Sequence, residues 1–150
     1  GILVTTRRKV VIEHNTFDQT MMSAILIADD AESWFESGPV KDVTIRSNTF
    51  NHCGGDGHPV ILIAPENASV DPDRPVHRNI KMEENTIRMD KGLVLSAKST
   101  RGLSFRSNQI CFSDANCKPD DVNDVIQLMA CSDVNIHSNT IMPRKTPKEA

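Results

Sequence analysis

Apolar and polar residues alternate through most of this chain, in segments that repeat. Five segments of nine residues each end in an Asn, a small or polar residue and a bulky apolar residue. They are KVVIEHNTF (Lys9 to Phe17), DVTIRSNTF (Asp42 to Phe50), NIKMEENTI (Asn79 to Ile87), GLSFRSNQI (Gly102 to Ile110) and DVNIHSNTI (Asp133 to Ile141). A period of two residues predicts strands, and no segment shows the period of a helix.

Five shorter apolar segments lie between these long ones, so that a short strand precedes each long strand. They are ILVT at 2–5, ILIA at 25–28, ILIA at 61–64, LVLS at 93–96 and QLMA at 127–130. Their starts are 23, 36, 32 and 34 residues apart, which indicates a bare unit of 23 residues with insertions in later units. A unit this small cannot bury its own apolar face and has to stack on copies of itself. The sequence therefore predicts an all-β fold, a right-handed parallel β-helix of about five coils over residues 1–142, with 143–150 as a tail.

The repeated Asn and the apolar residue two positions later predict two ladders inside the solenoid. Asn tolerates the left-handed conformation at a strand end, and its amide can bridge stacked coils. The amide ladder is expected from Asn15, Asn48, Asn85, Asn108 and Asn139, and the apolar ladder from Phe17, Phe50, Ile87, Ile110 and Ile141.

Composition agrees with a thin stacked core, because aromatic residues make up only 4% of the chain and Tyr is absent. The charges are mixed, with 17 basic and 20 acidic residues and a net charge of −3. A nucleic-acid partner is not expected, since phosphate binding needs a basic face. Membrane insertion is not expected either, because no apolar run approaches the roughly 18 residues of a membrane span.

The repeat is interrupted at one corner of two neighbouring coils. Between the short strand and the Asn, coils two and three use 20 and 21 residues, whereas coils one, four and five use 10, 12 and 9. Insertions in a solenoid gather on one face, which is often the binding face. Counting two residues beyond each short segment predicts a column of side chains across the coils: Arg7, Asp30, Glu66, Lys98 and Ser132.

The residue types at this corner suit a sugar site. A Trp face stacks on a sugar ring, charged groups hold hydroxyls, and an acid–base pair of carboxylates can cleave a glycosidic bond. Asp30 and Glu66 are the candidate catalytic residues. The candidate substrate-binding residues are Arg7, Asp29, Trp34, Glu36, Arg74 and Lys98. The same residues would also fit a charge-compensated surface with Trp34 under its own loop, or a calcium site made by Asp29, Asp30 and Glu66.

The stretches GILVTTRRKVVIEHNTF and AILIADDAESWFESGPVKDVTIRSNTF resemble the C-terminal part of the bacterial α-1,3-galactosidases. Residues 1–64 carry the resemblance, and DDAESWFESG is its distinctive part. These enzymes are parallel β-helix glycoside hydrolases that remove terminal α-1,3-linked galactose, including that of blood-group B antigens. The resemblance implies an inverting hydrolase without a cofactor, in the periplasm or outside a bacterial cell. It also implies that Asp30, Trp34 and Glu36 line the galactose pocket and that the principal catalytic aspartates lie on earlier coils.

Two other functions fit the same pattern: a carbohydrate-binding or adhesion β-helix without catalysis, and a calcium-dependent polysaccharide lyase with Arg74 or Lys98 as the base. The four cysteines form no CxxC pair, which excludes a zinc ribbon. Cys111 and Cys117 could bridge a turn or remain free thiols, and the turn NHCGGDGH could hold a metal or be only a turn. Exposed coil ends would allow a dimer.

Overall fold

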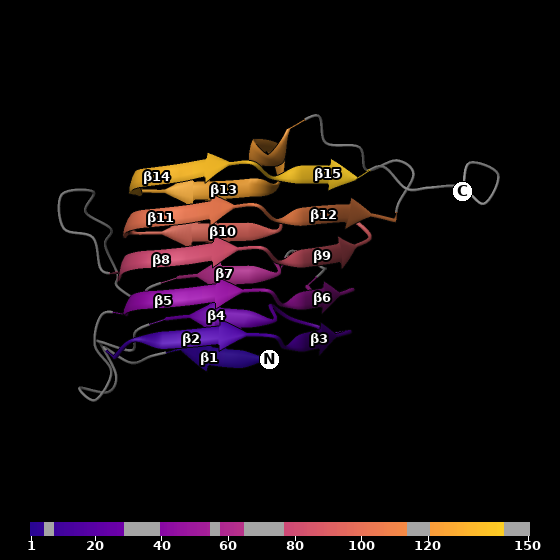
Figure 1. Ribbon diagram of the computed structural model, residues 1–150, viewed down its shortest axis with the longest axis horizontal. Coiled ribbons are helices and arrows are strands. Elements are labelled where there is room, and N and C mark those ends of the chain that lie inside the picture. Colours follow the sequence, from indigo (N-terminus) through magenta and orange to yellow (C-terminus); the bar gives the residue numbers. More distant parts are fainter. Residues whose placement is uncertain (5–7, 29–39, 55–57, 65–76, 114–120, 143–150) are drawn as a thin grey trace.

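The computed structural model describes residues 1–4, 8–28, 40–54, 58–64, 77–113 and 121–142. In this part of the chain the secondary structure consists of fifteen strands and one short 3-10 helix, η1 (Val122–Val125). The strands form three five-stranded sheets, which we call A, B and C in the order in which the chain visits them (Figure 1).

Each coil contributes one strand to each sheet. Sheet A contains β1 (Ile2–Val4), β4 (Ile25–Ile27), β7 (Ile61–Ile63), β10 (Leu95–Lys98) and β13 (Ile126–Met129). Sheet B contains β2 (Val10–Glu13), β5 (Lys41–Arg46), β8 (His77–Glu83), β11 (Thr100–Arg106) and β14 (Ser132–His137). Sheet C contains β3 (Thr16–Asp18), β6 (Thr49–Asn51), β9 (Thr86–Met89), β12 (Gln109–Phe112) and β15 (Thr140–Met142).

The fold is a right-handed parallel β-helix, as the repeat predicts. Every strand of the first four coils pairs in parallel with the strand of the same sheet in the next coil, beginning with β1 and β4. Figure 1 shows the coils stacked from the N-terminal to the C-terminal side, with sheet B running across the front of sheet A. The predicted long strand is in fact two strands, because the chain bends at the repeated Asn and passes from sheet B to sheet C.

The asparagine ladder is confirmed and runs through all five coils. Each of the first four Asn donates from its Nδ2 to the Oδ1 of the Asn in the next coil, at 3.0 to 3.2 Å. The same Oδ1 accepts the backbone N–H of the previous Asn, at 2.9 to 3.0 Å. Asn48, Asn85 and Asn108 are at most 1% exposed. These bonds satisfy the buried amides and lock neighbouring coils in register.

The sequence predicts the left-handed conformation of this bend at the repeated Asn, and this prediction is wrong. The residue before each Asn, not the Asn itself, has the positive φ. The five angles are 58° at His14, 54° at Ser47, 57° at Glu84, 56° at Ser107 and 60° at Ser138. The Asn then lies directly before the next strand with its side chain turned inward, where it hydrogen-bonds the adjacent coil.

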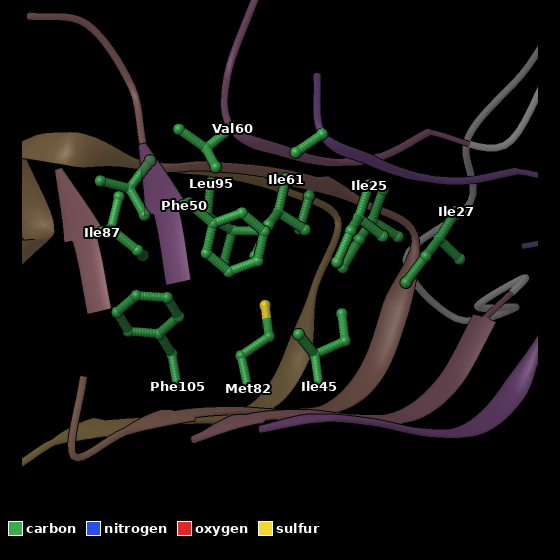
Figure 2. Packing of buried hydrophobic residues seen from close by; sticks show 14 of the residues in the cluster. Ile25, Ile27, Ile45, Phe50, Val60, Ile61, Met82, Ile87, Leu95 and Phe105 are labelled. Carbon is green, nitrogen blue, oxygen red and sulfur yellow. The ribbon is translucent and has the colours of Figure 1, made fainter. Parts of the chain in front are cut away.

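The apolar ladder is also confirmed. Phe17 pairs with Phe50 and Phe50 with Ile87, and the two Phe rings stack with their centroids 4.9 Å apart. Figure 2 shows the interior, where Ile45, Met82 and Phe105 of sheet B face apolar residues of the other two sheets. Cys53, Cys111 and Cys131 are free thiols, and Cys117 lies outside the described residues.

The last coil leaves part of the core open. Leu103 and Phe105 are at most 1% exposed, whereas their partners Val134 and Ile136 in β14 are only half-buried. A cavity of about 370 Å³ lies at this end, lined by Asp121, Val122, Asn123, Ile136, His137, Ser138, Asn139 and Ile141. A dimer through the coil ends stays a prediction. In the part of the chain that the structure describes, no helix is long and apolar enough to cross a membrane.

Candidate functional site

Both insertions open from the same corner, between sheets A and B, on adjacent coils. The first lies between the end of β4 at Ile27 and the start of β5 at Lys41, and the second between the end of β7 at Ile63 and the start of β8 at His77. Since β4 pairs with β7 and β5 with β8, the two insertions leave and rejoin the solenoid side by side. The expectation that they share one corner is therefore confirmed.

The same corner is tight in coil four. There β10 ends at Lys98 and β11 begins at Thr100, and Ser99 alone makes the bend with a φ of 51°. In coil five Ala130 adopts the same conformation, with a φ of 54°. One left-handed residue is thus enough to connect the two sheets, so the longer connections in coils two and three are additions to the fold rather than a requirement of it.

Most of the predicted site residues lie outside the described part of the chain. They are Arg7, Asp29, Asp30, Trp34, Glu36, Glu66 and Arg74. The structure places the strands on either side of them, and their individual roles stay predictions.

Lys98, the remaining candidate, is half-buried and ends β10 at this corner. The predicted column that joined Lys98 to Ser132 is wrong: Lys98 pairs with Met129 in sheet A, and Ser132 pairs with Arg101 in sheet B. The error comes from the starts of two short strands, since Leu95, not Leu93, pairs with Ile61, and Ile126, not Gln127, pairs with Leu95. A register counted from Leu93 shifts every later residue of that coil by two positions.

A buried histidine forms the floor of the corner. His77 and Val40 are both 0% exposed, and the Val40 N–H donates to His77 Nδ1 at 3.1 Å. Because Nδ1 accepts, the neutral ring carries its proton on Nε2. The His77 N–H donates to the Ser99 carbonyl at 3.0 Å, and the Arg78 N–H donates to the Val40 carbonyl at 3.0 Å. The last residue before β5 and the first residue of β8 are therefore tied to one another and to coil four.

His77 is not among the site residues predicted from the sequence. The available signal was its spacing, since His77, Ile80 and Met82 all face inward along β8. The spacing departs from strict alternation because Asn79 adopts a left-handed conformation with a φ of 55°. Asp42 of β5 and Gly102 of β11 do the same at the equivalent position.

At the opposite edge of sheet B, charged residues alternate in sign through the first four coils. The column consists of Glu13, Arg46, Glu83 and Arg106, each paired with the next, and His137 takes the same position in the fifth coil. We call it the alternating column. Arg46 Nε lies 2.7 Å from Glu13 Oε2, and Arg106 Nη2 lies 2.6 Å from Glu83 Oε2. The hydrogen bond to Glu13, together with the charge of Glu13, raises the pKa of Arg46.

The turn that follows sheet C has a polar cluster but not the arrangement of a nucleophilic enzyme. Asp90 accepts a hydrogen bond from Ser113, and His52 Nδ1 lies 3.4 Å from Asp90 Oδ1. The carboxylate stands between the hydroxyl and the imidazole, whereas a nucleophilic serine needs the imidazole beside it. Among the described residues no three His, Cys, Asp or Glu side chains could hold a metal together; Asp56 of the NHCGGDGH turn lies outside them.

Comparison with known proteins gives close relatives. The chain is 50% identical over 153 residues to an alpha-1,3-galactosidase A of Bacteroides fragilis, which covers all of this chain and 25% of that protein. It is 46% identical to an alpha-1,3-galactosidase A of Bacteroides thetaiotaomicron and 42% identical to an alpha-1,3-galactosidase B of the same organism. Each of these two alignments covers 94% of this chain and 24% of the relative. No protein-family model matches the chain.

The similarity extends over the whole chain, further than the residues 1–64 on which the resemblance was recognised. The chain spans about a quarter of the length of the curated relatives it matches. Its β-helix, with two insertions at one corner, is thus related to the bacterial alpha-1,3-galactosidases.

Proposed function

We propose that this chain forms part of the substrate-binding face of a glycoside hydrolase that removes terminal α-1,3-linked galactose by inverting hydrolysis. The observation that carries the proposal is the pair of insertions at one corner of adjacent coils, in a chain 42–50% identical to alpha-1,3-galactosidases. In the same proposal the protein works in the periplasm or outside a bacterial cell, where glycans of this kind are met.

The stacking of the coils suits the chemistry of inversion. An inverting glycosidase holds two carboxyl groups roughly 6.5–9.5 Å apart, so that one protonates the leaving oxygen while the other activates a water on the opposite face of the sugar. Adjacent coils stand about 4.8 Å apart, and carboxylates on neighbouring insertions can reach that separation. Asp30 and Glu66 are the pair proposed within this chain, with Trp34 stacked on the sugar ring.

The direct experiment measures galactose release from a blood-group-B trisaccharide by the 150-residue chain and by a longer protein that contains it. We expect galactose to be released with the β-anomer formed first, which proton NMR detects. The variants Asp30→Asn and Glu66→Gln are expected to lower the rate by at least about a hundredfold if they act as acid and base. Asp18→Asn is the matched control, because Asp18 is an exposed carboxylate on sheet C, away from the corner.

Three results would overturn the proposal. Saturable glycan binding without turnover by either protein would make the corner a binding module. An unsaturated, ultraviolet-absorbing product from polygalacturonate that disappears with EDTA would identify a lyase. Unchanged glycan binding by the Trp34→Ala variant would place the site elsewhere.

A further inference from the structure

Three cations of sheet B stand in one column beside the insertion corner. Lys41 of β5 pairs with Arg78 of β8, and Arg78 pairs with Arg101 of β11. We call these three residues the cation column. All three side chains are exposed, and adjacent coils are about 4.8 Å apart at the backbone. The same position in the fifth coil is the uncharged Ser132.

The fold does not require this column. Like charges directly opposite one another on neighbouring strands are destabilising, and the alternating column at the other edge of the same sheet avoids them. The two edges of sheet B have the same spacing between coils, but charges alternate in sign at one edge and are all positive at the other. The edge with like charges is the edge next to the insertions.

The neighbouring carboxylates neutralise the column only in part. Asp133 pairs with Arg101, with 3.1 Å between Oδ2 and Nε. Asp42, which follows Lys41, accepts a hydrogen bond from Asn79 Nδ2 at 2.6 Å. Within the described ranges no carboxylate forms an ion pair with Lys41 or Arg78. Two exposed cations on adjacent coils are left to bind an anion.

The cation column lies beside the corner at which the two insertions rejoin the solenoid. Lys41 begins β5, directly after the first insertion, and Arg78 is the second residue of β8, directly after the second insertion. Their backbones are fixed by the buried contact between Val40 and His77, since Val40 precedes Lys41 and His77 precedes Arg78. The two cations are therefore held at the mouth of the corner rather than on a free loop.

We propose that the cation column binds an anionic group, a sulfate ester or a carboxylate, on a sugar next to the galactose held at the corner. This inference rests on the proposed function for the galactose itself. A guanidinium presents its N–H groups in a fork that matches the paired oxygens of sulfate or carboxylate, and a lysine beside it adds a compact positive charge. The column would thus select acidic glycans among galactose-terminated ones.

The test compares binding of three galactose-terminated oligosaccharides to the 150-residue chain by calorimetry: a neutral one, one sulfated on the adjacent sugar and one with a uronic acid there. We expect an anionic oligosaccharide to bind about three- to tenfold more tightly than the neutral one in low salt. The preference should fall as salt is added, because exposed charges are screened. The two anionic arms show whether sulfate or carboxylate is the better ligand.

The double variant Lys41→Gln, Arg78→Gln should lose this preference and keep the affinity for the neutral oligosaccharide. The matched control, Arg46→Gln with Arg106→Gln, removes two exposed arginines from the alternating column and should keep the preference. Circular dichroism of each variant verifies the fold. Equal binding of neutral and anionic oligosaccharides, or a preference that survives the double variant, would overturn the proposal.

Failure of the proposed function gives a different result. In that case no galactose-terminated oligosaccharide binds better than its counterpart without galactose. A sulfated monosaccharide that lacks galactose still reports on the column, because its binding depends only on the cations. Absence of that binding together with good binding of the neutral oligosaccharide would reject the column and keep the galactose site.

Discussion

The two edges of sheet B differ in how regularly their interactions repeat from coil to coil. At the edge next to sheet C, the interactions repeat along the solenoid: the asparagine ladder inside, through all five coils, and the alternating column outside, through the first four. At the edge next to sheet A, the coils differ, and two insertions, a buried histidine and the cation column replace the repeat. The uniform edge holds the coils together, and the edge where uniformity stops is the one at which we propose that sugar binds.

The largest expected effect comes from breaking the uniform edge at its centre. Asn85→Ala removes the acceptor of the Asn48 backbone N–H and the donor to the Ile45 carbonyl, and all of these groups are buried. Each buried polar group left without a partner costs about 1–3 kcal/mol, so we expect a loss of about 2–5 kcal/mol in the free energy of unfolding, measured with urea. Asn15→Ala, at the exposed end of the ladder, is the control and should lose much less. Equal losses at both positions would show that the ladder does not act through burial.

The second effect concerns the edge with the insertions. His77→Leu leaves the buried Val40 N–H without its acceptor and should cost about 1–3 kcal/mol of unfolding free energy. His77→Asn keeps an acceptor at the δ position and should recover part of the loss. Amide hydrogen exchange at Val40 is the specific readout and should accelerate in the Leu variant. If the two variants lost the same stability and exchanged alike, the hydrogen bond would not be what holds this edge.

A pair of charge reversals compares the two columns directly. Glu83→Lys removes the pair with Arg106 and places a cation between Arg46 and Arg106, so a loss of about 0.5–2 kcal/mol is expected. Arg78→Glu puts an acid between two cations and should leave stability unchanged or raise it. Thermal unfolding at low and high salt measures both, and the difference between them should shrink with salt. A loss in Arg78→Glu as large as in Glu83→Lys would mean that the cation column stabilises the fold.

The smallest expected effect concerns how the stability contributed by Arg46 depends on pH. We expect no such dependence in the neutral range. The hydrogen bond to Glu13 and its charge raise the pKa of Arg46. A raised pKa contributes stability that is fully present below the ordinary value and is lost only as the pH rises through the folded value. The ordinary pKa of an arginine side chain already lies far above the neutral range, so Arg46→Gln should change the unfolding free energy equally at about pH 7 and pH 9. A difference between these two values would show that another titrating group is coupled to the pair.

The repeated segments by themselves determined the fold. Alternation with a period of two, the Asn of each unit and the apolar residue two positions later predicted the parallel β-helix and both of its ladders. These features are local or repeat identically, so each coil predicts the same strands and the same ladder positions. The corner with the insertions was also predictable, because it needs only a count of residues between two recognisable segments, and the resemblance to alpha-1,3-galactosidases was visible in the first coils.

Only the tertiary structure decided which side chains meet across coils. Successive asparagines of the ladder are 33, 37, 23 and 31 residues apart, so a position cannot be carried from one coil to the next by counting. Misplaced starts of the short strands produced the wrong register at Lys98, and the uneven spacing concealed the contact between Val40 and His77. The cation column was hidden for the same reason, since Lys41, Arg78 and Arg101 belong to three coils and become neighbours only when the strands pair.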